Sequence, residues 1–191
     1  MKSNRMNGHA GGPARRRMRA GVAELRLMVL VLVLGLLGTT AAGLRWVFRG
    51  MQQERMCIEH LQQIYSAFEL YQAEHGALPR LVLYPEEKYA NGSLLRFLRD
   101  VGYPEEIAIC PACGRRIRKY GVSYIWNTEL NNQRLGKTGL TWMLVEINAL
   151  DPTNYPAPHR GKYHVLYTDG TVRRTEHPPP GLTPDSGDGS Q

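Results

Sequence analysis

The sequence predicts an α+β fold, in which one long N-terminal helix, membrane-spanning in its first half, packs on a small antiparallel sheet. Three observations predict it. Residues 27–44 contain no charged side chain, residues 51–75 carry apolar side chains at helical spacing, and short β-like runs follow between residues 106 and 174. About 140 residues lie beyond the apolar run, which suffices for one domain with a modest core.

The uncharged run at residues 27–44 has the length of a membrane span. At a helical rise of about 1.5 Å per residue it covers roughly 27 Å, close to the roughly 30 Å hydrocarbon core of a bilayer. Arg45, Trp46 and Phe48 follow it, as residues at a membrane interface do. We therefore predict a transmembrane helix at 25–48. The alternative, a buried core helix, would rarely be apolar on every face.

The flanks of this helix predict its orientation. Acidic residues are absent before Glu24, whereas basic residues are frequent there: Lys2, Arg5, Arg15, Arg16, Arg17 and Arg19. By the positive-inside rule, residues 1–24 form a cytoplasmic leader, and the C-terminal domain is periplasmic or otherwise extracytoplasmic. We expect a single-pass protein of the inner (cytoplasmic) membrane. A cleaved signal peptide is the alternative, but its apolar region would be shorter, about 7–15 residues.

Beyond the span the helical pattern continues. Apolar side chains recur at spacings of four, three, four and three residues: Cys57, Leu61, Ile64, Phe68 and Tyr71. Gly76 suits the left-handed position after a helix, and Pro79 cannot continue one. The sequence therefore predicts a helix at 49–76 that is continuous with the span and buries one face.

The remaining elements are short. A helix is expected at 93–100, with Ser93 or Asn91 as its cap, after an irregular connection at 81–89. The sheet region spans 105–175, with strands expected at 106–110, 123–126, 141–146, 163–167 and 171–174. Asp169-Gly170 predicts a two-residue hairpin turn between the last two strands. Residues 178–191 lack apolar periodicity and are expected to be disordered.

The net charge of +7 does not indicate nucleic-acid binding. Many basic residues lie in the leader, where topology explains them, and no basic run alternates with stacking aromatic residues. One cluster remains, and we expect it to be a solvated loop: Arg115, Arg116, Arg118 and Lys119. Neither a cofactor nor a small-molecule substrate is expected.

A basic leader, a span that merges into an amphipathic helix and a small sheet domain together resemble type IV pilins and type II secretion pseudopilins. Individual motifs resemble a pseudopilin-like family of planctomycete and verrucomicrobial bacteria. They are the segment from Cys57 to Tyr71, His75-Gly-Ala-Leu-Pro79, Cys110-Pro111, and Ser123-Tyr124-Ile-Trp-Asn127. His159, nine further residues and then Asp169-Gly170 match the spacing of the prepilin-associated H-x9-DG motif.

The resemblance implies a pilin-like exported domain at 49–177 and a structural function. The chain would be a minor pseudopilin or pilin-like component of a type II secretion or type IV pilus-like system, not an enzyme. Its partners would be the membrane and other pilin-like subunits or secretion-system components. The alternative is a membrane-tethered extracytoplasmic binding module that is not assembled into a filament.

The leader junction departs from the family pattern. Family prepilins are cut after a glycine, and the fifth residue of the mature chain is glutamate. Here the junction runs Ala20-Gly21-Val22-Ala23-Glu24, so that cleavage after Gly21 would make Glu24 the third residue. Cleavage would have to follow Arg19 to make it the fifth. Alternatively, Glu24 is an interfacial residue beside Arg26.

The three cysteines, Cys57, Cys110 and Cys113, would face an oxidising compartment. We expect one disulfide and one free thiol, with all three pairings open; a bond to Cys57 would tie the long helix to the sheet. The second interpretation is a zinc site at Cys110-Pro-Ala-Cys113. Because structural zinc usually has four ligands, Cys57, His159 or His164 would have to complete that site.

His159 and Asp169, with Glu146 as a further carboxylate, are candidates for catalysis or metal binding. Tight turns select aspartate before glycine in any case, and His159 can hydrogen-bond within its loop. Carboxylates are too sparse for a calcium loop. We therefore expect structural roles for these residues, no catalytic residue and no resident metal.

Overall fold

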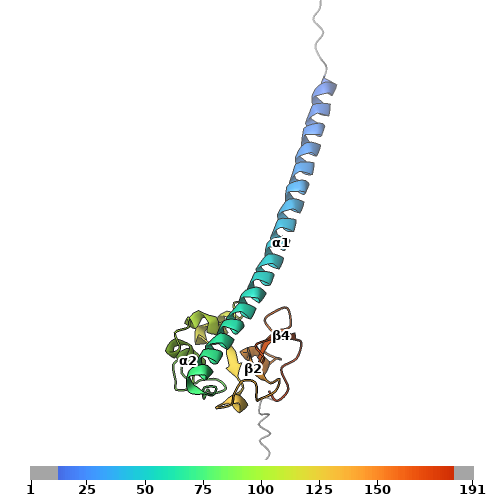
Figure 1. The fold of residues 1–191 in the computed structure, drawn as a ribbon. Helices are drawn as coiled ribbons and strands as arrows, with labels where there is room; N and C mark the ends of the chain where they lie inside the picture. The colour runs from blue at the N-terminus through green and yellow to red at the C-terminus, as the bar shows by residue number, and fades with distance from the viewer. Residues whose placement is uncertain (1–12, 183–191) are drawn as a thin grey trace, which may run out of the picture. The chain divides into compact units, whose positions relative to one another are not determined.

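The computed structural model describes residues 13–182, with side chains from Arg26 onward (Figure 1). The chain is α+β, with one long apolar N-terminal helix and a four-stranded antiparallel sheet. It divides after Phe48 into two units, each of which is described by itself.

The first unit contains the N-terminal part of helix α1, Pro13–His75. Within the described residues the helix is present from Pro13, the first of them. It therefore extends into the basic leader. The side chains of Ala20, Gly21 and Glu24 lie outside the described ones, so the prediction about leader processing stays a prediction.

From Arg26 onward α1 is long and apolar enough to cross a membrane, by length and composition. None of its most apolar eighteen-residue window is buried. Leu32 is 69% exposed and Trp46 is 74% exposed. A soluble protein rarely exposes so large a contiguous apolar surface, so this surface requires a cover such as lipid or other helices.

In the second unit the C-terminal part of α1 buries one face, as the spacing predicts. The side chains of Cys57, Leu61, Ile64 and Phe68 have no exposed surface. The helix ends at His75, where Gly76 has a φ of +80° and its N–H bonds the carbonyl of Gln72 at 2.7 Å. That αL closure satisfies a carbonyl of the last turn.

The sheet has the order β1-β2-β3-β4, and every neighbouring pair is antiparallel. Its strands are β1 Tyr124–Trp126, β2 Trp142–Glu146, β3 Tyr163–Tyr167 and β4 Val172–Thr175. One face packs with α1 in the larger core, through Trp126, Leu144 and Leu166 (Figure 1). The other face forms a second core around Val145 and Val165, because successive strand residues point to opposite faces.

Strand β4 forms one edge of the sheet and is more exposed than the others. Arg173 and Arg174 are exposed along it. Arg173 Nη2 lies 3.8 Å from Asp169 Oδ2, and Arg174 Nη1 lies 2.9 Å from Glu54 Oε1 on α1. The edge strand therefore carries two adjacent cations, each paired with a carboxylate.

Helix α2, Leu94–Asp100, has the predicted cap, since the Ser93 side chain accepts a hydrogen bond from the Arg96 N–H. Three short 3₁₀ helices complete the domain: η1 Glu105–Ala108, η2 Thr128–Leu130 and η3 Ile147–Leu150. The strand predicted at 106–110 was wrong. Pro104 presets the backbone at the start of η1, and Glu105 and Glu106 occupy its first turn, where acids are favourable.

Three other predictions differ from the structure. The basic cluster expected as a loop forms helix α3, Arg115–Tyr120, closed by Gly121 in the αL conformation. The hairpin after β3 has a three-residue loop at 168–170, because Tyr167 N–H bonds the Thr171 carbonyl and Gly170 takes a φ of +78°. Leu182 belongs to the second core rather than to a disordered tail; residues 183–191 lie outside the described part.

Candidate functional site

Five buried side chains with metal-binding or nucleophilic atoms meet where α1 covers the sheet. We call this group the buried cluster; it consists of Cys57, Cys110, Glu146, His159 and His164. All five are 0–3% exposed. Such a concentration of ionisable groups inside a small core is unusual, because burial of a charge costs free energy unless partners compensate it.

Strand register places two members of the cluster side by side. Val145 pairs with Val165, so the next residues, Glu146 on β2 and His164 on β3, lie opposite each other on the face toward α1. Tyr124 on β1 pairs with Glu146, and Arg174 on β4 pairs with His164. One row of polar side chains therefore crosses all four strands beneath the helix.

His159 reaches the cluster from the turn before β3. The backbone N–H of His159 donates to the Lys162 carbonyl at 3.3 Å, and the backbone N–H of Lys162 donates to the His159 carbonyl at 3.2 Å. The two residues between them, Arg160 and Gly161, have φ values of +56° and +79°. Positive φ at both central positions defines a type I′ turn, whose twist matches that of the flanking chain. The turn fixes the position from which the imidazole enters the core.

Cys110 is positioned by Ser123, which directly precedes β1, and by α1. The Ser123 hydroxyl accepts a hydrogen bond from the Cys110 N–H and donates one to the Ala108 carbonyl at 3.3 Å. On the helix side, His60 Nδ1 lies 3.1 Å from the Ile109 carbonyl oxygen, and Gln53 donates to the Pro111 carbonyl at 3.3 Å. The segment at 109–111 is therefore fastened from two sides.

The atoms of the cluster form one continuous set of contacts. Cys110 Sγ lies 3.1 Å from His159 Nε2, and His159 Nε2 lies 3.4 Å from Glu146 Oε1. Cys57 Sγ donates to the same carboxylate oxygen at 3.5 Å and lies 3.2 Å from the Tyr124 hydroxyl oxygen. His164 Nδ1 lies 3.5 Å from Glu146 Oε1. Oxygen Oε1 of Glu146 is thus the common neighbour of three other members.

Mutual interactions change the acidity of these groups. A hydrogen bond from Cys57 and another from His159 lower the pKa of Cys110 against the effect of burial. Burial alone would lower the pKa of His159, but hydrogen bonds to Cys110 and Glu146 raise it to about 9. Burial likewise opposes ionisation of Glu146, yet the neighbouring imidazoles of His159 and His164 hold its pKa below the ordinary value. These contacts therefore favour an anionic Cys110 sulfur and an anionic Glu146 carboxylate beside a cationic His159 imidazole.

His164 is the least satisfied member. It is 1% exposed, and within the described part of the chain neither ring nitrogen has a hydrogen-bond partner. Its Nε2 lies 3.8 Å from Glu54 Oε1, the oxygen that Arg174 also contacts. Glu54 therefore stands between the cluster and the exposed edge of the sheet.

The structure brings together some of the predicted site residues and separates others. Cys57, Cys110 and His159 meet, and Glu146 and His164 join them. Cys113 is buried outside the set of mutually close donors, and Asp169 is exposed at the hairpin loop, where Thr171 donates two hydrogen bonds to it. All three cysteines are free thiols, so the expected disulfide is not present. The zinc pair predicted at Cys110 and Cys113 is likewise not the group that converges.

Sequence reasoning missed Glu54, Tyr124 and Arg174 as supports of this group. A signal existed only for the two strand residues that they support: Glu146 ends the apolar run of β2, and His164 interrupts the apolar run of β3. A polar residue at a position that alternation assigns to the core marks a buried polar site. Only the register, however, shows that these positions are neighbours.

The arrangement suits metal binding or structural pairing better than nucleophilic catalysis. A thiolate beside an imidazolium is the chemistry of an activated nucleophile. Here Cys110 has no exposed surface and His159 is 3% exposed, so a substrate has no access to the sulfur in this conformation.

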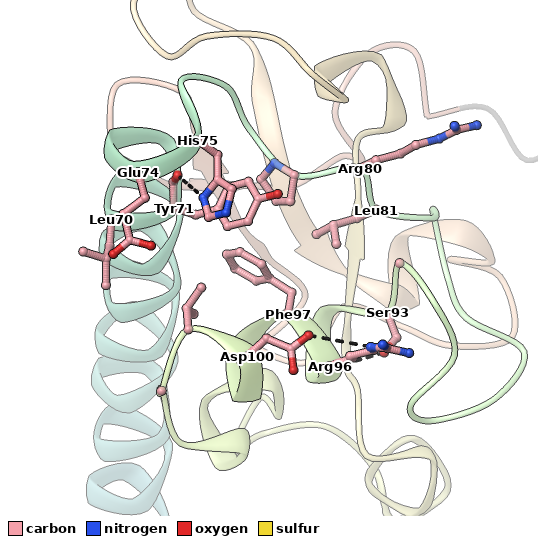
Figure 2. A pocket seen from close by; sticks show the side chains of 14 residues that line it. Leu70, Tyr71, Glu74, His75, Arg80, Leu81, Ser93, Arg96, Phe97 and Asp100 are labelled. Atoms are coloured by element: carbon pink, nitrogen blue, oxygen red, sulfur yellow. Dashed lines mark hydrogen bonds and ion pairs between the residues drawn. The ribbon is translucent and has the colours of Figure 1, made fainter.

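A separate hollow of about 740 Å³ lies between the C-terminal end of α1 and α2 (Figure 2). Two pairs of its charged and aromatic groups contact each other. Arg96 lies 3.6 Å from Asp100, and the rings of Tyr71 and His75 stack with centroids 4.0 Å apart. These internal pairs leave the hollow without a distinctive set of groups that would define a ligand.

In comparisons with known proteins, no family model matches the chain, and neither curated proteins nor solved structures show a significant similarity to it.

Proposed function

We propose that this protein is a membrane-anchored, pilin-like structural subunit, a minor pseudopilin of a type II secretion or type IV pilus-like system. The observation that carries the proposal is the composition of α1. A single helix combines an unburied apolar segment of membrane-spanning length with a C-terminal segment that forms one wall of an α+β core. A subunit that assembles through its helix requires one helix segment free to contact other subunits and another that holds its own domain.

The proposed mechanism is lateral association of the apolar helix segments of neighbouring subunits. A Cβ added at Gly35, Gly38 or Gly43 would meet nothing within 4 Å, so these positions offer a smooth surface to another helix. Small residues let helix backbones approach closely in a membrane. Their spacings of three and five do not form a strict GxxxG motif, so packing of a different register is expected.

The two ends of the H-x9-DG motif support the proposal because both fasten β3 to the helix. His159 enters the buried cluster with Cys57 of α1. At the other end Tyr65 of α1 donates to the Thr168 carbonyl at 3.3 Å, and its ring lies against Gly170. In this interpretation the motif joins the sheet to the assembling helix.

The proposed topology has the leader in the cytoplasm and the sheet domain outside the inner membrane. The basic residues before the span support it through the positive-inside rule. In the alternative, the same topology belongs to a tethered binding module whose span stays in the bilayer.

Mass spectrometry of the N-terminus of the membrane-extracted protein tests the proposal. We expect a shortened chain with a methylated first residue, cut after Gly21 or Arg19. Gly21→Leu should block cleavage after Gly21, while Gly35→Leu, a matched change inside the span, should leave it unchanged. An intact Met1 leader on every copy would refute assembly as a pilin and favour the tether.

A further inference from the structure

Four donors of the buried cluster lie close enough together to share one metal ion. One ligand atom from each of Cys57, Glu146, His159 and His164 lies within 4.8 Å of each of the others. We call these four residues the donor group. Cys110 borders it through its contact with His159.

The distances from Glu146 to the other three donors fit tetrahedral zinc. Zinc bonds of about 2.0–2.1 Å to nitrogen or oxygen and about 2.3 Å to sulfur place neighbouring ligand atoms about 3.3–3.7 Å apart. Glu146 Oε1 lies 3.4 Å from His159 Nε2, 3.5 Å from Cys57 Sγ and 3.5 Å from His164 Nδ1. Three edges of a tetrahedron therefore already have the required length.

Charge balance favours a divalent cation at this place. A thiolate and a carboxylate carry two negative charges, and two neutral imidazoles add none, so the site with Zn²⁺ would be neutral. Glu146 is fully buried, and within the described residues its ion-pair partners are the two histidines. Buried charges are paired or coordinate metals, and a neutral ion complex avoids the cost of burying net charge.

His164 supplies an independent indication. Its ring nitrogens make no hydrogen bond among the described residues and lie 3.5 Å from Glu146 and 3.8 Å from Glu54, so the enclosed imidazole recovers little of the solvation that it loses. Coordination through Nδ1 would satisfy one nitrogen and leave Nε2–H directed at Glu54, 3.8 Å away. Metal-bound histidines commonly donate their second N–H to a carboxylate in this way.

The surrounding groups also hold the other donors. The backbone N–H of His164 donates to Glu146 Oε2 at 2.8 Å, which leaves Oε1 for the ion. The Tyr124 hydroxyl lies 3.2 Å from Cys57 Sγ, where it can donate to a thiolate. Both supports come from the backbone or from a buried side chain, so they restrict donor movement.

We propose that the donor group binds one zinc ion as a closed structural site that joins α1 to β2, β3 and the turn before β3. On binding, Cys57 loses its thiol proton to solvent and coordinates as the thiolate. The site does not depend on the proposed function, because a tethered module would contain it equally.

Metal analysis of the full chain, purified in detergent without added chelator, tests the proposal. We expect one zinc per chain, retained in Cys113→Ser and lost in Cys57→Ser and in His164→Gln. Cys113→Ser is the matched control because it removes a buried thiol that lies outside the donor group. Wild-type protein that carries no zinc and does not take it up from a stoichiometric supply would overturn the proposal. A Cys57–Cys110 disulfide in the intact mass would overturn it too, because that sulfur could not then be a thiolate ligand.

Cobalt substitution gives a second test that does not require a variant to fold. We expect Co²⁺ bound to the wild-type chain to show thiolate-to-cobalt charge transfer and the strong visible bands of a tetrahedral site. Stoichiometric Zn²⁺ should abolish both. Weak, octahedral-type bands without charge transfer would show that cobalt binds elsewhere and would contradict the donor group.

Discussion

At the scale of single residues, the position of Glu146 follows from the alternation of its strand. It lies two residues after Leu144 on β2, on the same face, where an apolar side chain would complete the core. A carboxylate there is stable only with compensating partners, and Cys57, His159 and His164 surround it. One buried carboxylate on the core side of a strand therefore requires polar partners at the neighbouring core positions.

Glu54 should act as a positioning residue for the zinc site. Glu54→Gln should weaken zinc binding about 10–100-fold, because the amide cannot accept the His164 Nε2–H as strongly as a carboxylate. Competition with a chromogenic chelator measures the change. Glu59→Gln is the matched control on the exposed side of the same helix and should bind as the wild type does. Equal affinities for the two variants would show that Glu54 does not orient His164.

Gly170 should tolerate no side chain. A Cβ there would lie 2.9 Å from Tyr65 Cε1, and the φ of +78° disfavours L residues. Gly136 has a φ of +84° and open space around it, so Gly136→Ala introduces backbone strain without a steric clash. It should cost about 1–2 kcal/mol. Gly170→Ala should cost about 1–3 kcal/mol more, through overpacking against Tyr65. Urea unfolding compares the two, and equal midpoints would contradict the contact with Tyr65.

Much of the site could be predicted from the sequence, but its convergence could not. Helical spacing places Cys57 on the buried face of α1, and the cysteines and histidines are recognisable as ligands by type. Whether Cys110 or Cys113 approaches Cys57 depends on how Ser123 holds the preceding loop. The pairing of Glu146 with His164 depends on a register that residues far apart in the chain decide together.

At the scale of elements, the buried face of α1 organises the domain. Phe68 stacks on Phe97 of α2 and contacts the ring of Trp126 of β1, both with centroids 4.8 Å away. Helix, second helix and sheet thus meet at one aromatic group. The prediction of this face was confirmed because a period of 3.6 residues is a local property of the sequence.

Phe68→Ala should destabilise the domain by about 3–5 kcal/mol, since it leaves a cavity among rings that cannot collapse into it. Leu70→Ala removes a side chain from the same helix that is 43% exposed, and it should change stability by less than about 0.5 kcal/mol. The shift of the urea midpoint distinguishes them. A small effect of Phe68→Ala would mean that the aromatic group does not hold the elements together.

The short elements were the least predictable. The apolar run from Ile107 to Cys110 resembles a short buried strand, yet Pro104 and two acids begin a 3₁₀ helix. Arg115–Tyr120 lacks apolar periodicity beyond Ile117, which is its one buried residue. Elements of one or two turns depend on packing rather than on their own propensity, so their sequences carry little signal.

At the scale of the whole molecule, the two units differ in how their apolar side chains are buried. The side chains of the first are exposed and apolar over its most hydrophobic window, whereas both cores lie within the second. Among the residues whose side chains are described, the first to enter either core is Cys57. The second unit therefore contains all the burial it needs to fold.

A chain that begins at Arg49 should consequently be soluble and folded without detergent. We expect a cooperative thermal transition and, if the donor group binds zinc, the same metal content as the full-length protein. A matched chain that begins at Leu61 should not fold cooperatively, because it lacks Glu54 and Cys57. A molten, non-cooperative product from the Arg49 chain would show that the apolar segment is needed for folding.

Strand β4 has a consequence for how copies of this chain can meet. At the β4 edge, extended chain from a second copy would have to pair beside Arg173 and Arg174 and their carboxylate partners. Charged edge strands oppose such addition in natural sheet proteins. Arg173 and Arg174 thus oppose edge-to-edge aggregation of the sheets of different copies. Crowding of many copies in one membrane would then favour contacts between helices and leave the sheets separate.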